Sequence, residues 1–314
     1  MKKVFFRTAI LCLIAGFTLG GCGKDEEKVS VTGVTLSQTS ANLFPNDNFK
    51  LIAVVSPGNA TNQKLLWTSS NPTVASVSDG TVTALTVGEA VITVTTEEGG
   101  TTASCTVTVK KMPEIKITVV NNCLIGLVGS GMASIDWGDG SSQTYELSTY
   151  GTVSHDYSTV GSRTITISRA NITSFSCNHQ DITSLDVSKN PALTHLSCFL
   201  NQLTSLDLSN NPALTYLDCG NNQLTSLDLS NNPALTEIQC SYNQLTALDL
   251  SNNTELLTIR CAGNQLSAAA LNLLFLSLHD TTIEGEEKNI YVYSNPGRND
   301  CDMSISRAKG WHAW

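Results

Sequence analysis

Residues 193–213, LTHLSCFLNQLTSLDLSNNPA, and residues 214–234, LTYLDCGNNQLTSLDLSNNPA, are two copies of one 21-residue unit. The unit recurs between Ile172 and Leu266, and a cysteine marks each of its five copies: Cys177, Cys198, Cys219, Cys240 and Cys261. A fixed period of this length predicts a solenoid, because one unit cannot bury its apolar face alone. Equivalent residues of stacked coils lie about 4.8 Å apart, so each column predicts a continuous buried seam.

The unit follows the pattern L-x-x-L-x-C-x-x-N-x-L and so resembles the leucine-rich repeat family. The resemblance implies an asparagine ladder, formed here by Asn201, Asn222, Asn243 and Asn264, with Gln180 in the first coil. Its role would be to satisfy backbone groups where the chain leaves each strand. A second column follows the other half of the unit: Asn190, Asn211, Asn232 and Asn253. Nothing in the unit has a period of 3.6, so we expect a strand on one side of each coil and extended chain on the other.

The N-terminus reads as an export signal. Residues 1–21 combine a basic start, an apolar stretch of about a dozen residues and small residues before Cys22, which is too short for a membrane span. Leu19-Gly20-Gly21-Cys22 resembles the bacterial lipobox, which implies cleavage before Cys22 and lipidation of that residue. An ordinary cleaved signal is the alternative.

Residues 22–28 form the expected tether. Lys24 is followed by Asp25, Glu26 and Glu27, and this run resembles the surface-export signal of Bacteroidota lipoproteins. A solvated charged linker is the alternative. The expected location is therefore the outer membrane, with a lipid anchor on Cys22 and the chain exposed at the cell surface. The net charge of −9 argues against nucleic acid as a partner.

Residues 29–111 alternate apolar and polar side chains in short runs separated by turns such as Asp79-Gly80, which is typical of a β-sandwich. The segment resembles the bacterial immunoglobulin-like domain, group 2. The matching motifs are VTGVTLS (31–37), WTSSNPTVASV (67–77), DGTVTA (79–84) and GEAVITV (88–94). The resemblance implies Trp67 as a core anchor and a spacer or adhesive role.

Residues 113–170 form a second β module. IDWGDG (135–140) and HDY (155–157) resemble the marks of the PKD-type domain, although the segment is short for it. Asp136, Asp139 and His155 allow two interpretations, as metal ligands or as groups that satisfy turn amides. The module is expected to contact the first coil of the solenoid directly.

Residues 267–314 are expected to form a small α/β C-terminal cap. Ser267 precedes strong helix formers and can cap a helix whose Leu and Phe residues cover the last coil. Residues 290–293 read as a strand and residues 302–309 as a short helix. Trp311 and Trp314 are interpreted as cap packing, with an aromatic ligand platform as the alternative.

The cysteines allow a disulfide framework, as expected for an exported chain. The 21-residue period favours buried free thiols instead, because Leu or Val occupies the position equivalent to Cys in the other half of the unit. A single stack also lacks convergent tetrahedral ligands for a metal. The column of Asp186, Asp207, Asp228 and Asp249 allows a calcium ladder or local turn bonds. No catalytic constellation or cofactor motif is recognisable, so we predict no enzyme and no cofactor.

The cysteine half of the unit varies between coils at its outward positions, whereas the half with the sequence LTSLDLSNN is nearly identical in successive coils. Alternation on a strand predicts that these variable residues share one face. Large side chains there are the kind that carry binding energy at interfaces. The predicted ligand-binding residues are His195, Phe199, Leu200, Tyr216, Asp218, Glu237, Gln239, Tyr242 and Arg260. Drift without selection would produce the same variability.

The sequence thus predicts a mostly β, non-enzymatic surface lipoprotein with an immunoglobulin-like β-sandwich, a PKD-like module and leucine-rich repeats over residues 171–266. We expect a monomer that binds a protein or glycan through the variable face of the repeats. A structural or periplasmic envelope component is one alternative. An accessory binding subunit of a polysaccharide-utilisation system is another.

Overall fold

The computed structural model describes residues 28–147, 151–281 and 286–314. The expected signal peptide, the lipidation site Cys22 and the acidic run at residues 24–27 lie outside the described residues. In the described ranges, no helix has the length and apolar character needed to cross a membrane. The chain divides into two units, described separately below. The predicted mostly β fold with an immunoglobulin-like domain and a leucine-rich repeat is confirmed.

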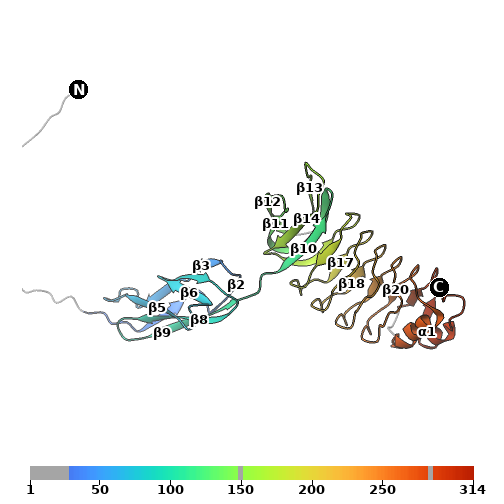
Figure 1. Ribbon diagram of the computed structural model, residues 1–314. Coiled ribbons are helices and arrows are strands. Elements are labelled where there is room, and N and C mark those ends of the chain that lie inside the picture. Colours follow the sequence, from blue (N-terminus) through green and yellow to red (C-terminus); the bar gives the residue numbers. More distant parts are fainter. Residues whose placement is uncertain (1–27, 148–150, 282–285) are drawn as a thin grey trace, which may run out of the picture. The chain divides into compact units, whose positions relative to one another are not determined.

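The first module contains sheets of four, three and two strands (Figure 1). The four-stranded sheet has the order β2-β9-β8-β5, the three-stranded sheet has the order β3-β7-β6, and β1 pairs with β4. The strands are β1 (Gly33–Leu36), β2 (Ser40–Leu43), β3 (Asn48–Lys50), β4 (Ala53–Ser56), β5 (Leu65–Ser69), β6 (Ala75–Ser78), β7 (Thr81–Ala84), β8 (Gly88–Thr96) and β9 (Thr102–Val109).

The alternation of the sequence forms the core of this module. Alternate residues of β8 and β9 are buried, among them Ile92, Val94 and Val107. The prediction that Trp67 anchors the core is wrong, because its side chain is only half buried. It lies opposite Val94 on β5, an edge strand that has a neighbour on one side only. Its ring lies against Gly80, where an added Cβ would be 3.0 Å from a ring carbon.

The second module contains β10 (Glu114–Val119), β11 (Cys123–Asp136), β12 (Ser142–Leu147), β13 (Gly151–His155) and β14 (Arg163–Ser168). The long strand β11 pairs with β13 along its first half and with β12 and β14 along its second half, always antiparallel. Strand β10 pairs with β14 in a register that places Ile117 opposite Ile165. Both side chains are buried.

The solenoid presents one short strand per coil. These strands are β15 (Asn171–Ser176), β17 (His195–Ser197), β18 (Tyr216–Asp218), β19 (Glu237–Gln239) and β20 (Thr258–Arg260). They pair in parallel, and the 21-residue period sets the register, so Leu196, Leu217 and Ile238 stand side by side. The ribbon on the other side of these coils is extended chain, as the missing helical period predicts (Figure 1).

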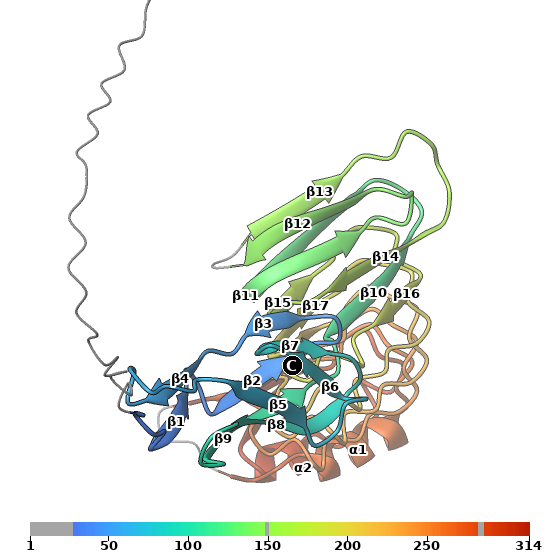
Figure 2. The same cartoon turned by 90° about the vertical axis from the view of Figure 1, so that its left-hand side faces the viewer.

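The second module covers the start of the solenoid. Strand β11 pairs antiparallel with β15, while β10 pairs with β16 (Ser184–Asp186), so both halves of the first coil are engaged (Figure 2). One continuous cluster of buried apolar side chains runs from Ile115 to Trp311. The predicted direct contact between the module and the first coil is therefore confirmed.

The parallel sheet extends past Leu266, where the sequence predicts that the repeats end. Helix α1 (Ala268–Ser277) begins after Ser267, whose side chain accepts a bond from the amide of Ala270. Strand β21 (Lys288–Tyr291) then pairs with β20, and β22 (Trp311–Ala313) pairs with β21. Helix α2 (Met303–Ala308) lies between these two strands in the sequence. Strand β21 thus adds a sixth coil.

The asparagine ladder makes the predicted backbone contacts. Nδ2 of Asn222 donates to the carbonyl oxygens of Cys198 at 2.9 Å and Cys219 at 3.1 Å. Its Oδ1 accepts from the amide of Leu203 at 3.0 Å. Each ladder asparagine therefore joins two coils. Asn295 makes the same two carbonyl contacts in the sixth coil.

The cysteine column is buried, as predicted. The five thiols have no exposed surface and form no disulfide bonds. Burial raises their pKa values, to about 12 for Cys240. In the aspartate column, Oδ1 of each residue accepts from the backbone amide two positions later, at 2.9 to 3.0 Å. These turn bonds confirm the second interpretation of that column.

Candidate functional site

Outward side chains of β17 to β20 form a polar and aromatic surface, here called the variable sheet face. Each of these strands has three residues, of which the middle one is buried, so the first and third residues point outward. The variable sheet face consists of His195, Ser197, Tyr216, Asp218, Glu237, Gln239, Thr258 and Arg260. It includes six of the nine predicted ligand-binding residues.

Contacts across three coils hold this face in place. The ring of His195 stacks on that of Tyr216, with centroids 6.0 Å apart. Nε2 of Gln239 donates to the hydroxyl oxygen of Tyr216 and to Oε1 of Glu237, both at 3.0 Å. Side chains fixed by their neighbours lose less conformational freedom when a ligand binds. The face is therefore preorganised.

Among the residues that the structure describes, no ion pair neutralises the two carboxylates of the face. Burial raises the pKa of Asp218, and the neighbouring charge of Glu237 raises it further. Burial also raises the pKa of Tyr216 to about 12, with contributions from both carboxylates. None of the ion pairs formed between described residues includes Asp218, Glu237 or Arg260. The guanidinium of Arg260 instead lies over the ring of Tyr291, 4.6 Å from its centroid.

The other three predicted residues lie beside this face, in the turns that follow the strands. The expectation that Leu200 and Tyr242 lie on a strand is wrong. Both adopt left-handed backbone conformations, with φ angles of 57° and 56°. They are 41% and 50% exposed. Phe199 is half buried, and its ring makes an edge contact with that of His179. These turns, residues 199–200, 220–221, 241–242, 262–263 and 293–294, are here called the turn rim.

Two further contributors are not among the nine predicted residues. Oδ1 of Asn178 accepts from the hydroxyl of Ser197 at 2.9 Å and from the amide of Phe199 at 2.8 Å. Tyr291 lies beside Arg260 because β21 continues the sheet. A signal for Tyr291 exists: residues 290–295, IYVYSN, match IRCAGN at residues 259–264 in their Ile and Asn positions.

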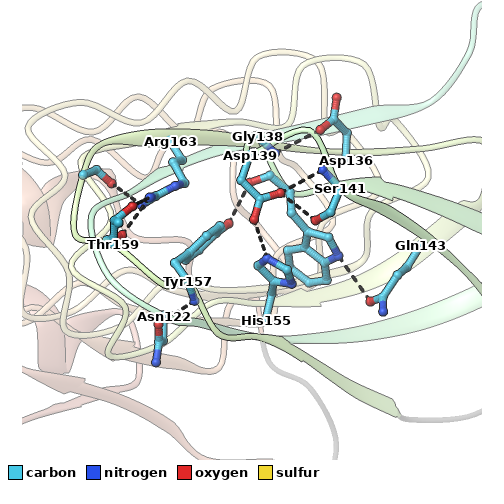
Figure 3. A network of polar contacts seen from close by, with 12 residues as sticks. Asn122, Asp136, Gly138, Asp139, Ser141, Gln143, His155, Tyr157, Thr159 and Arg163 are labelled. Carbon is cyan, nitrogen blue, oxygen red and sulfur yellow. Dashed lines mark hydrogen bonds and ion pairs between the residues drawn. The ribbon is translucent and has the colours of Figure 1, made fainter.

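A second polar cluster lies in the module that precedes the solenoid (Figure 3). Asp139 accepts through Oδ1 from the amide of Ser141 at 2.9 Å, and its Oδ2 lies 2.8 Å from Nε2 of His155. Asp136 accepts from the amide of Gly138. The His155 ring stacks on Trp137 with centroids 4.8 Å apart. The carboxylates thus satisfy turn amides, the second of the two predicted interpretations. Nowhere in the described ranges do three or more His, Cys, Asp or Glu residues gather so that they could hold a metal.

The two C-terminal tryptophans differ. Trp311 is buried, and its Nε1 donates to the carbonyl oxygen of His279 at 2.9 Å, which confirms its role in packing. Trp314 is 56% exposed and donates to Oδ1 of Asn289, so the packing prediction is wrong for this residue. It directly follows β22, the strand at one end of the sheet.

Two segments of the chain match known families. Residues 30–107 match the bacterial Ig-like domain (group 2), and residues 191–232 match leucine-rich repeats (2 copies). The chain carries an Ig-like domain and leucine-rich repeats.

Relatives match over short segments. An alpha-L-arabinofuranosidase of Bifidobacterium longum subsp. longum is 41% identical over 85 residues, which cover 27% of this chain and 8% of the relative. An Ig-like virion protein of Serratia phage KSP90 is 41% identical over 83 residues, 26% of this chain and 32% of the relative. The chain therefore spans less than two thirds of the length of either curated relative.

Two solved structures from Listeria monocytogenes resemble parts of the fold. The functional domain of InlJ, which includes a cysteine ladder, is 30% identical with a TM-score of 0.30, covering 43% of this chain and 37% of that one. An internalin, InlF, is 19% identical with a TM-score of 0.32, covering 45% and 46%. Similarity at these TM-scores carries no functional inference.

Proposed function

We propose that this protein is a non-enzymatic cell-surface binding protein that engages a protein or glycan through the variable sheet face. A lipid on Cys22 would anchor it in the outer membrane, and the Ig-like and second modules would act as spacers. Ig-like domains and leucine-rich repeats are typically non-catalytic, which supports this class of function.

The observation that carries the proposal is the contrast within each coil. The half reading LTSLDLSNN is nearly invariant, while the strand beside it presents different side chains in every coil. Those side chains are prearranged by the bonds of Gln239 and the stack of His195 on Tyr216. They also include two carboxylates without a cation partner among the described residues. Their oxygens can accept hydrogen bonds from a protein or glycan partner.

Two alternative functions follow from the same modules. A structural or periplasmic envelope component would need the fold but not the face. An accessory binding subunit of a polysaccharide-utilisation system would need the face and a glycan ligand. The first alternative differs from the proposal in location, because a periplasmic component would not be accessible from outside the cell.

The test uses intact cells that carry the full chain. We expect external protease to remove the solenoid from intact cells, and Cys22→Ala to release the protein from membranes and abolish incorporation of labelled fatty acid. Replacement of residues 24–27 by neutral residues should keep the lipid but protect the protein from external protease. Cells carrying the chain should adhere to at least one immobilised glycan or extracellular matrix protein. Protection of the wild-type chain in intact cells, or no gain in adhesion, would contradict the proposal.

A further inference from the structure

Aromatic side chains occupy alternate coils along the turn rim. Phe199 is in the second coil, Tyr242 in the fourth and Tyr293 in the sixth. Tyr242 and Tyr293 are 50% and 47% exposed, and Phe199 is half buried. The intervening coils carry Gly220 and Gly263 in the same turns. Phe199, Gly220 and Tyr293 occupy the first position of the turn, whereas Tyr242 and Gly263 occupy the second. Coil by coil, a turn with an aromatic residue therefore alternates with a turn that contains glycine.

Gly263 makes room for the ring of Tyr242, and Gly220 lies in contact with the ring of Phe199. A Cβ added at Gly263 would lie 2.5 Å from Cδ1 and 2.8 Å from Cε1 of Tyr242, so the ring lies directly against the glycine backbone. A Cβ added at Gly220 would be 3.4 Å from Cδ2 of Phe199. A ring that rests against the backbone is held in orientation while its other side remains available. The half-exposed ring of Tyr242 is thus suited to stacking, and that of Phe199 is oriented by Gly220 on one side and by an edge contact with His179.

The spacing of the rings distinguishes among ligands. Stacked strands are about 4.8 Å apart, so rings in alternate coils are separated by about 10 Å along the solenoid. A peptide strand presents the same face every two residues, about 6.6 Å, and does not match this spacing. In an extended β-1,4-linked glycan, alternate sugar residues present the same face, and one sugar residue is about as long as one coil is thick. The apolar face of a sugar stacks on an aromatic ring.

The neighbouring groups favour a neutral chain of sugars. The variable sheet face beside the rim offers carboxylate, amide and hydroxyl groups that bond to sugar hydroxyls, namely Asp218, Glu237, Gln239 and Ser197. The two carboxylates lack a cation partner among the described residues, so they would repel an anionic glycan. We propose that the turn rim binds a neutral, extended β-1,4-linked glycan lying along the solenoid, with alternate sugars on Phe199, Tyr242 and Tyr293. This inference rests on the proposed function and narrows its ligand to one class.

The test measures binding of the full chain to hexasaccharides of β-1,4-linked glucose, mannose and xylose, by calorimetry and saturation-transfer NMR. At least one should bind, its disaccharide should bind at least about tenfold more weakly because it cannot reach two rings, and hexagalacturonate should not bind. Tyr242→Ala should weaken binding about thirtyfold, as truncation of an interface aromatic commonly does. Thr246→Ala is the matched control, at an exposed position in the invariant half of the coil that carries Tyr242, and should leave the affinity unchanged.

Gly263→Ala provides an independent arm, because its Cβ displaces the Tyr242 ring and should weaken binding as Tyr242→Ala does. Phe199→Ala, which leaves both glycines intact, covers the case in which Gly263→Ala fails to fold. Absence of binding by all three neutral hexasaccharides, or equal losses in Tyr242→Ala and Thr246→Ala, would overturn the inference. If cells still adhere to a matrix protein through the variable sheet face in that case, the proposed function stands while the glycan inference fails.

Discussion

Nδ2 of Asn295 donates to the carbonyl oxygen of Cys261 at 3.0 Å, which is the bond that Asn264 makes to Cys240 one coil earlier. The asparagine ladder thus passes from the regular repeat into the sixth coil. Because its polar atoms are buried, a ladder asparagine stabilises the stack by satisfying backbone groups that water cannot reach.

Asn222→Ala should destabilise the solenoid strongly. The substitution removes bonds to the carbonyl oxygens of Cys198 and Cys219 and to the amide of Leu203, and leaves these buried groups unsatisfied. We expect a loss of about 3 kcal/mol or more in the free energy of unfolding, measured by urea denaturation. Asn231→Ala, at an exposed position of the same coil, should cost under about 0.5 kcal/mol. Similar losses for the two variants would contradict the ladder's role.

The cysteine column should behave as a row of small apolar side chains. Because burial holds the thiol pKa values high, native protein should resist alkylation at all five ladder cysteines, whereas half-buried Cys301 should react sooner. Denatured, unreduced protein should label at all six. A disulfide between Cys198 and Cys219, found by mass spectrometry, would contradict this account.

Substitutions of Cys219 should separate size from polarity. Cys219→Val replaces one small apolar group by another and should cost less than about 1.5 kcal/mol. Cys219→Asp places an unpaired charge in the core and should cost about 3 to 5 kcal/mol, by analogy with broken buried ion pairs. Chemical denaturation of both variants provides the measurement, and a tolerated aspartate would show that the column is not buried.

Asp218→Asn should stabilise the protein at neutral pH. The folded state raises the pKa of Asp218, so it binds the proton more tightly than the unfolded chain does, and stability is lost as the pH rises through 3.8, the ordinary value, toward the folded value. Asparagine keeps an oxygen for the amide of Gly220 but has no charge to bury. The thermal midpoint should be higher than that of the wild type at pH 7 and equal to it below about pH 3. A lower midpoint at pH 7 would contradict the assignment.

Asp139→Asn should act in the opposite direction. Bonds from Ser141 and His155 hold the pKa of Asp139 below its usual range, so its ionised form stabilises the turn above pH 3.8 and this contribution is lost as the pH falls. The thermal midpoint should therefore fall at pH 7. Asp156→Asn, at an exposed neighbouring position, is the control and should change little. An unchanged thermal midpoint in Asp139→Asn would contradict the claim that ionised Asp139 stabilises the turn.

The period of the repeat allowed much of the solenoid to be predicted. Cysteine and asparagine recur at identical positions in each unit, and identical positions in stacked coils must share one environment. The sixth coil escaped because α1 lengthens the interval from Asn264 to Asn295 beyond the 21-residue period. A search for a fixed 21-residue period therefore fails to detect this coil, although the coil continues the same sheet after an inserted helix.

The candidate site was predicted in part for a related reason. Strand alternation correctly placed residues such as Tyr216 and Gln239, but each strand has only three residues. Leu200 and Tyr242 lie past its end, in left-handed conformations that non-glycine side chains rarely adopt. The ring of Tyr242 against Gly263 is a contact between coils, and alternation within one coil does not predict it.

Binding after alanine substitution on the two sides of the same coils tests the central claim most directly. One variant carries Tyr216→Ala and Gln239→Ala on the variable sheet face. Its control carries Thr204→Ala, Thr225→Ala and Thr246→Ala, at equivalent exposed positions in the invariant half. With a ligand found by adhesion to immobilised glycans and matrix proteins, we predict at least about thirtyfold weaker binding for the first variant and unchanged binding for the second. Equal losses in both variants, or full affinity in the first, would contradict the account.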